Sequence, residues 1–193
     1  MINLESLNIA DCGKITDVGF SEVCKLPRLK KLTFRACSTI TDHGLCGIQN
    51  LINLASLDMA NCDQVTDVGF SAVCRLPLLK TLNINLCANI SEHGLCGIKI
   101  LIDLESLGIA ATKMTDFGFA SICELPRLKK LDITYCVNVI DRGLCVIKKL
   151  VNLELLDITG CENISDNGLC SICLLYTSPS PRDLSTSRMP SSA

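Results

Sequence analysis

The stretch Leu54-Ala55-Ser56-Leu57-Asp58-Met59-Ala60-Asn61-Cys62-Asp63-Gln64-Val65-Thr66-Asp67-Val68-Gly69-Phe70 recurs along this chain with little drift. A fixed period of roughly 20 to 50 residues indicates a solenoid, in which each repeat is one supersecondary unit stacked on the next. Successive repeats are 25 residues apart, except for one interval of 24 between residues 104 and 128. The chain is therefore predicted to be one stack of about seven repeats, whose first leucines are Leu4, Leu29, Leu54, Leu79, Leu104, Leu128 and Leu153.

Each repeat predicts one strand followed by one helix. Leu57 and Met59 alternate with polar neighbours, which is the period of a half-buried strand. Thr66 and Asp67 are typical of a helix start, because the hydroxyl caps free amides and the acid suits the positive end of the helix dipole. Stacking would place the strands about 4.8 Å apart in one parallel sheet. We therefore expect an α/β architecture.

Three features modify this simple repeat. Residues 1–50 and 51–100 are identical at more than half of their positions, so the deeper unit is a pair of repeats. The fifth repeat is one residue short, and Ala110-Ala111-Thr112 stands where other repeats have a cysteine. Ile140 occupies the capping position of the sixth repeat. We expect a local irregularity in the fifth loop, without chemistry of its own.

The pattern L-x-x-L-x-I-x-x-C-x-x-I-T-D-x-G-F/L resembles the cysteine-containing class of leucine-rich repeats, at residues 4–20, 29–45 and 54–70. The resemblance covers residues 1–172 and implies a leucine-rich repeat solenoid, with a curved parallel sheet inside and short helices outside. This class is best known as the substrate-recognition part of F-box adaptors of ubiquitin ligases. A stand-alone scaffold or regulatory array without a ubiquitin link is the alternative, and an extracellular receptor ectodomain is a third possibility.

The domain organisation is expected to be simple. Residues 1–172 form the repeat array, and we expect them to be an internal fragment of a longer protein, because residues 1–4 align with 51–54 and 101–104 in mid-array. Residues 173–183, CLLYTSPSPRD, match the translation of a common sequencing adapter, and residues 187–193 match the sequence that follows it. Residues 173–193 are therefore expected to be a non-native, disordered tail.

The cysteines fall into three columns along the predicted stack. We expect buried structural thiols, since free cysteine is often fully buried. Disulfides between neighbouring strands are an alternative, although the strand spacing exceeds the favoured Cβ separation of about 3.8 Å. Zinc binding is the third alternative, but a site needs about four convergent ligands. Unpaired thiols favour a cytoplasmic or nuclear location. The columns are Cys12, Cys37, Cys62, Cys87, Cys136 and Cys161; Cys24, Cys74 and Cys123; and Cys46, Cys96, Cys145 and Cys170.

The sequence does not predict an enzyme, a cofactor or a metal site. His43 and His93 lie two repeats apart, on the order of 10 Å at the strand spacing, which is too far to share one metal. They are expected to be solvated residues at helix starts. The formal net charge of −2 argues against nucleic acid, which requires a basic stripe.

The strand residues that flank each buried pair are expected to line the concave face of the solenoid. They give a polar strip of mixed charge, which is the candidate binding surface for a protein partner. We expect no nucleic acid, membrane or small-molecule substrate there, and a merely solvated sheet face is the alternative. The candidate site residues are Lys31, Arg35, Asp58, Asn83, Asn85, Lys130, Asp132, Leu155 and Asp157.

Overall fold

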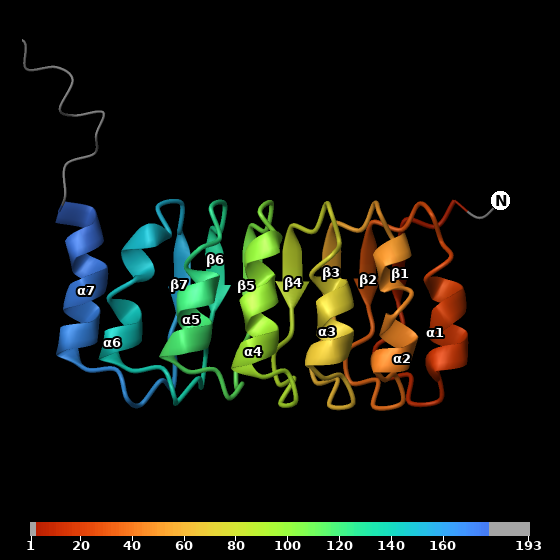
Figure 1. The fold of residues 1–193 in the computed structure, drawn as a ribbon, viewed down its shortest axis with the longest axis horizontal. Helices are drawn as coiled ribbons and strands as arrows, with labels where there is room; N and C mark the ends of the chain where they lie inside the picture. Colours follow the sequence, from red (N-terminus) through yellow and green to blue (C-terminus); the bar gives the residue numbers. More distant parts are fainter. Residues whose placement is uncertain (1–2, 178–193) are drawn as a thin grey trace, which may run out of the picture.

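The computed structural model describes residues 3–177, which form one continuous stack of seven repeats. Each repeat gives one strand to a single open sheet, and every neighbouring pair of strands is parallel. Strands line one face of the stack and helices cover the other (Figure 1). The predicted leucine-rich repeat solenoid is confirmed. Its strands are β1 (Ser6–Asn8), β2 (Lys31–Thr33), β3 (Ser56–Asp58), β4 (Thr81–Asn83), β5 (Ser106–Gly108), β6 (Lys130–Asp132) and β7 (Leu155–Asp157).

The helices alternate between two forms, as the duplication of a repeat pair predicts. Odd-numbered repeats have one helix: α1 (Asp17–Val23), α3 (Asp67–Val73), α5 (Asp116–Ile122) and the longer α7 (Asp166–Thr177). Even-numbered repeats have a single turn of α-helix: α2 (Asp42–Leu45), α4 (Glu92–Leu95) and α6 (Asp141–Leu144). A short 3-10 helix follows each of these: η1 (Ile48–Asn50), η2 (Cys96–Ile100) and η3 (Ile147–Lys149).

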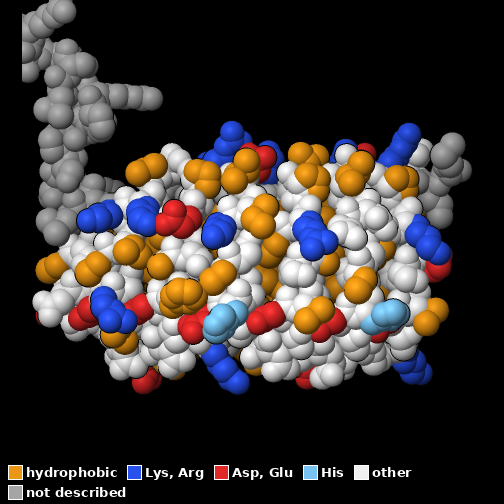
Figure 2. Space-filling model, in the orientation of Figure 1, with side chains coloured by type: hydrophobic (Ala, Val, Ile, Leu, Met, Phe, Trp, Pro, Cys, Tyr) orange, Lys and Arg blue, Asp and Glu red, His pale blue; other side chains and the backbone are white. Residues whose placement is uncertain are grey.

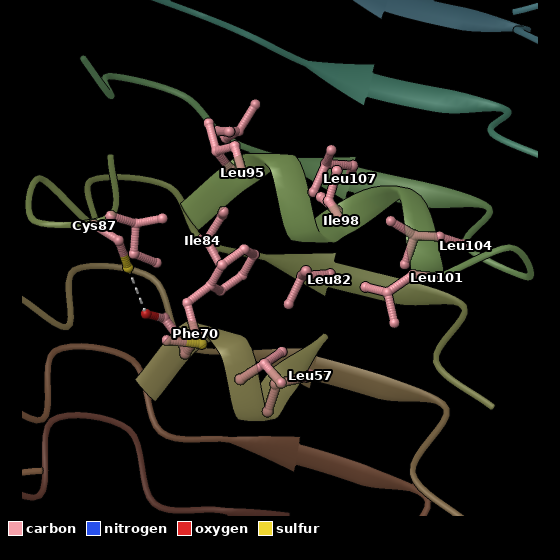
Figure 3. Close-up of a cluster of buried hydrophobic side chains, with 14 of the residues drawn as sticks. Leu57, Phe70, Leu82, Ile84, Cys87, Leu95, Ile98, Leu101, Leu104 and Leu107 are labelled. Atoms are coloured by element: carbon pink, nitrogen blue, oxygen red, sulfur yellow. Dashed lines mark hydrogen bonds between the residues drawn. The ribbon is translucent and has the colours of Figure 1, made fainter. Parts of the chain in front are cut away.

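Apolar side chains fill the space between the sheet and the helices as one continuous core. The strand leucines form a row in register, so that Leu57 lies beside Leu82, and both are fully buried (Figure 3). Phe70 from α3 packs over them, and in the first repeats the rings of Phe20 and Phe34 meet edge to face at 4.8 Å. Burying each such side chain contributes about 1.5–3 kcal/mol, so stability is spread along the whole array.

Most of the predicted helix caps form, but the acid that follows each cap has a second role. Thr66 accepts a hydrogen bond from the Val68 amide. Ile140 has no hydroxyl and α6 lacks a side-chain cap, and α1 lacks one as well, although Thr16 precedes it. In addition, the Asp42 carboxylate of the second repeat accepts the Thr66 amide at 2.8 Å and the Thr66 hydroxyl at 2.6 Å. Each acid therefore also ties its own helix start to the next repeat, a role that its position beside the helix dipole did not predict.

We call this series the carboxylate ladder; it consists of Asp17, Asp42, Asp67, Glu92, Asp116 and Asp141. The ladder explains the glycine near the helix start in every repeat but the first and the fifth. The amide of Gly69 also donates to Asp42, at 2.9 Å, and a Cβ on that glycine would lie 2.5 Å from the same carboxylate oxygen. No larger residue fits so close to the acid of the preceding repeat.

The chain turns after each strand at a residue with positive φ, and in six of seven repeats that residue is not glycine. Its amide donates to the carbonyl of the next repeat, as Leu86 does to Ala110 at 2.8 Å, so the turn is fixed by inter-repeat bonding. Gly160 takes this position in the seventh repeat, where a Cβ would lie 2.3 Å from the ring of Tyr135. Glycine is thus required there by the aromatic side chain of the repeat before it.

The fifth repeat keeps this turn despite its missing residue. Ala111 has a φ of 54°, and Thr112 occupies the buried place that cysteine has in its neighbours. The Thr112 hydroxyl donates to the Ile109 carbonyl at 3.0 Å and lies 3.6 Å from the Cys136 sulfur. The predicted irregularity is therefore limited to a shorter connection between Thr112 and Met114.

The last described helix runs further than expected. α7 continues through Thr177, so the first five residues of the segment 173–193, which we expected to be disordered, are helical. Elongating an existing helix costs far less than nucleating one, and α7 already begins at Asp166. The rest of the expected tail, residues 178–193, lies outside the described residues.

Candidate functional site

The register of the strands arranges the candidate residues in three columns across the strand face. Lys31, Lys130 and Leu155 lie in the first column, which the pairing carries from β1 to β7. The second column lies two residues further along each strand; it contains Asp58, Asn83, Asp132 and Asp157. Arg35 and Asn85 follow the ends of β2 and β4 and belong to the third. The strip is thus continuous over all seven strands.

The acids and amides of the strip are engaged with the backbone. Asp58, Asn83, Asp132 and Asp157 each accept a hydrogen bond from the amide two residues further along their own chain, at 2.9–3.2 Å. The hydroxyl and amide of Thr159 lower the pKa of the Asp157 carboxyl. All four side chains are half-buried. Their first role is therefore to close the turn after each strand.

Asn85 and Asp132 meet across the fifth strand, although 47 residues separate them. The Asn85 side-chain amide donates to the Asp132 carboxylate at 3.1 Å, and its oxygen accepts the Ala110 amide at 2.7 Å. Gly108 makes this contact possible, because a Cβ there would lie 2.9 Å from the Asn85 oxygen. The strand face has a small hydrogen-bonded bridge at its centre.

The cations of the strip remain open to solvent. Lys31, Arg35 and Lys130 are exposed and take part in no ion pair among residues 3–173. The residues directly before the strands, in contrast, form ion pairs such as Lys129–Glu105, at 2.8 Å. Lys129 lowers the pKa of Glu105. Leu155 is 49% exposed at the end of the first column. The candidate residues that are most open to a partner are therefore these three cations and Leu155.

Sequence reasoning missed two apolar side chains beside this strip. Leu86 and Tyr135 occupy the positive-φ position after β4 and β6, and they are 52% and 60% exposed. The signal was present in the sequence, since both residues follow directly on the third column of the strip. They widen the candidate surface toward the loops that lead to the helices.

Two of the three cysteine columns are buried as predicted. The thiol of Cys87 donates to the carbonyl of Met59 in the preceding repeat at 3.1 Å (Figure 3). Cys37, Cys62, Cys136 and Cys161 make the equivalent bond. Burial raises the pKa of the Cys74 thiol, in the second column, to about 12. Cys12, in the first repeat, is exposed.

The prediction was wrong for the third column. Cys46, Cys145 and Cys170 are exposed and Cys96 is half-buried. The position lies on the outer side of the helix, where the Cys46 thiol donates to the Asp42 carbonyl one turn back, at 3.4 Å. All fourteen cysteines are free thiols.

The helix face has little that suggests catalysis. His43 and His93 are exposed (Figure 2), and no cluster of three or more potential metal ligands occurs within the described part of the chain. No described helix is both long and apolar enough to cross a bilayer. A shallow groove of about 370 Å³ lies between α3 and α4, lined by Asp67, Ser71, Cys74, Arg75, His93, Gly94, Gly97 and Ile100.

Comparisons with known proteins agree with this architecture. Residues 1–24, 50–74 and 149–173 match the family model described as Leucine Rich repeat. No curated protein sequence matches the chain. An internalin (inlF) from Listeria monocytogenes is similar in structure, with a TM-score of 0.69 and 26% identity. A chain of the Rad7–Elc1 complex of yeast is also similar, with a TM-score of 0.68 and 19% identity.

Both similarities cover 88% of this chain but only 45% and 46% of the two known chains. This chain therefore spans less than half the length of either structural neighbour. The likeness to the chain of the Rad7–Elc1 complex, at 19% identity, concerns the fold alone. The seven-stranded stack and the matched repeats together identify the fold as a leucine-rich repeat solenoid, the architecture of a protein-interaction module.

Proposed function

We propose that this chain binds a protein partner across the strand face. The observation that carries the proposal is the set of exposed cations Lys31, Arg35 and Lys130, which take part in no ion pair within the described residues. An extended face of short strands presents such side chains on a rigid scaffold, and arginine is among the residues favoured at interface hot spots. Leu155 adds an apolar contact at one end, and the half-buried acids and amides hold the strip in shape.

A charge-reversal variant tests this proposal. Lys31→Glu and Arg35→Glu together should lose the partners that wild-type protein captures from cells, as measured by quantitative mass spectrometry. Lys14→Glu with Lys113→Glu is the matched control, because both lysines are exposed and lie in the loops beyond the strip. Equal capture by the strand-face variant and wild type, with both folded by circular dichroism, would contradict the proposal.

The finer proposal is that this array is the substrate-recognition part of an F-box-type ubiquitin-ligase adaptor, acting in the cytoplasm or nucleus. The resemblance of residues 1–172 to cysteine-containing repeats supports it. The alternative, a stand-alone scaffold, is supported by the same repeats. The full-length transcript separates the two: an F-box encoded ahead of the first repeat favours the adaptor, and terminal caps without one favour the scaffold.

A further inference from the structure

The charges of this protein are separated between the two long edges of the stack. One edge, which runs from the end of each helix to the residue before the next strand, comprises residues 3–5, 22–30, 47–55, 72–80, 97–105, 121–129 and 146–154. We call it the helix-end edge. It has ten Lys or Arg against six Asp or Glu, a net charge of +4. The remaining residues up to 173 have six against thirteen, a net charge of −7.

Figure 2 shows the tendency on the helix face, where cations are more frequent in the upper rows and most acids lie in the lower ones with both histidines, among a few cations. Its acidic side is partly explained by the carboxylate ladder, which lies at the helix starts. The basic side has no comparable structural explanation. Most of the acidic residues on the helix-end edge form ion pairs with lysine or arginine, as in Lys25–Glu22, Arg127–Asp103 and Lys149–Glu124. Arg75, Lys99 and Lys148 take part in no ion pair within residues 3–173.

An exposed apolar residue stands on this edge in every one of six successive repeats. We call the row the crest; it consists of Pro27, Ile52, Pro77, Ile102, Pro126 and Val151. Ile52, Ile102 and Val151 are 58%, 61% and 79% exposed, while the leucines directly before them are buried. Leu78 directly follows Pro77, and Ile100 precedes Ile102 by two residues; both are exposed as well. Scattered apolar side chains on a surface are ordinary, but a continuous row is typical of an interaction site.

We propose that the helix-end edge is a second protein-binding surface, and that its partner is an acidic segment with aliphatic side chains. The acidic side chains would meet Arg75, Lys99 and Lys148, and the aliphatic ones would cover the crest. A cationic field also raises the association rate with an acidic partner. This surface is separate from the strand-face strip, so it does not depend on the function proposed above.

Two other occupants fit the edge less well. An anionic bilayer binds surfaces that combine cations with a broad apolar face, whereas the crest is a single row of side chains. Nucleic acid binding rests on contacts between cations and phosphates, for which the aliphatic side chains of the crest provide no partner. A protein segment of mixed chemistry satisfies both the charges and the crest.

A synthetic peptide tests the proposal on the complete 193-residue chain. The probe is a fluorescent 20-residue peptide of glutamate and leucine at helical spacing, and the control peptide has glutamine in place of glutamate. Fluorescence anisotropy should show at least about tenfold tighter binding of the glutamate peptide at low salt, and this preference should fall as salt is raised. Equal binding of the two peptides would overturn the proposal.

Variants locate the site. Ile52→Ser, Ile102→Ser and Val151→Ser together, and separately Arg75→Glu, Lys99→Glu and Lys148→Glu together, should each weaken binding by about tenfold or more. The strand-face variant of Lys31 and Arg35 should bind the peptide as wild type does, which separates this proposal from the previous one. Retention of binding by both edge variants would refute the assignment. So would tighter binding to phosphatidylserine vesicles or to duplex DNA than to the glutamate peptide.

Discussion

The two large cysteine columns place the same side chain in opposite environments. In the column that follows the strands, Cys62 and Cys87 are fully buried, and each thiol donates to a backbone carbonyl of the preceding repeat. In the column on the helices, Cys46 is exposed, and its thiol bonds only within its own turn. Elsewhere in the helix column the contacts between repeats are longer: Cys96 accepts from the Ser121 hydroxyl at 3.7 Å, and the Cys145 sulfur lies 3.6 Å from the Ser171 hydroxyl. The position within the repeat therefore decides what a cysteine contributes.

The difference follows from the direction in which each side chain points. Residues after the strand turn under the loop, into the layer between the sheet and the helices, where no water reaches them. Residues at the end of α2, α4 and α6 point away from that layer, and their neighbours Leu45, Leu95 and Leu144 fill it instead. The first column is a structural feature of the fold, while the third column, on the helices, can vary with little consequence.

A charge placed in each column should give the largest contrast. Cys62→Asp should destabilise the protein by more than about 4 kcal/mol or prevent folding, because a buried carboxylate has no partner there. Cys46→Asp should cost at most about 1 kcal/mol, because solvent reaches the new side chain. Urea unfolding followed by circular dichroism measures both variants. Similar losses in the two variants would contradict the assignment of Cys46 to the outer surface.

Thiol labelling in the native protein tests the same comparison without mutation. Burial raises the pKa of Cys24 and Cys87 to about 11 and that of Cys62 and Cys123 to about 12. At pH 8, about one in a thousand or fewer of these four thiols is then ionised, and only the thiolate reacts. The five exposed cysteines should react with a disulfide reagent at least about 100-fold faster than the eight buried ones.

The same reagent counts the free thiols once the protein is unfolded. Guanidinium chloride should release all fourteen, since none is paired in the structure. A single fast phase in the native protein would contradict the burial of the first column. A count well below fourteen would instead indicate disulfides, and it would revive the extracellular receptor as an alternative.

Truncation to alanine should give a smaller contrast of the same sign. Cys87→Ala removes a buried sulfur and its bond to Met59, and it should cost about 1–3 kcal/mol. Cys96→Ala should change stability by less than about 0.5 kcal/mol, because alanine favours the helix and little surface is lost. Chemical unfolding of both variants provides the test. A loss above about 1 kcal/mol in the Cys96 variant would show that the half-buried thiol does pack.

The period of 25 residues and the alternation around Leu57 and Met59 were enough to predict the stack, its parallel sheet and its register. The sequence did not predict which side of a four-residue helix is buried, because one turn is too short to show a helical period. Hence the expectation of buried thiols in all three columns was wrong at Cys46.

The parts of the candidate site that depend on distant residues could not be predicted. Asn85 meets Asp132 only because the register places them on either side of Gly108. Asp42 bonds Thr66 of the next repeat, whereas its own sequence neighbours suggest only a helix start. The row of Pro27, Ile52 and Ile102 was present in the sequence, but its exposure follows from the packing of the leucines beside it.

Acid should distinguish the carboxylate ladder from the thiol column, although both link neighbouring repeats. The hydroxyl and amide of Ser165 lower the pKa of Asp141 below its usual value. A carboxyl whose pKa is lower in the folded than in the unfolded state stabilises the fold above the unfolded pKa, near 4. That contribution is lost as the pH falls through the lower, folded pKa. Cys161, whose pKa is raised by burial, does not titrate in this range.

Asp141→Asn should therefore reduce the fall in the urea midpoint between pH 6 and pH 3, because the variant has already lost the titrating group. Cys161→Ala should lower the midpoint at both pH values by the same amount and leave the difference unchanged. The effect of a single exposed carboxylate is small, so the two variants are compared with wild type at each pH. An unchanged pH dependence in the Asp141 variant would show that this carboxylate contributes through geometry rather than through its charge, and the two inter-repeat links would then be equivalent.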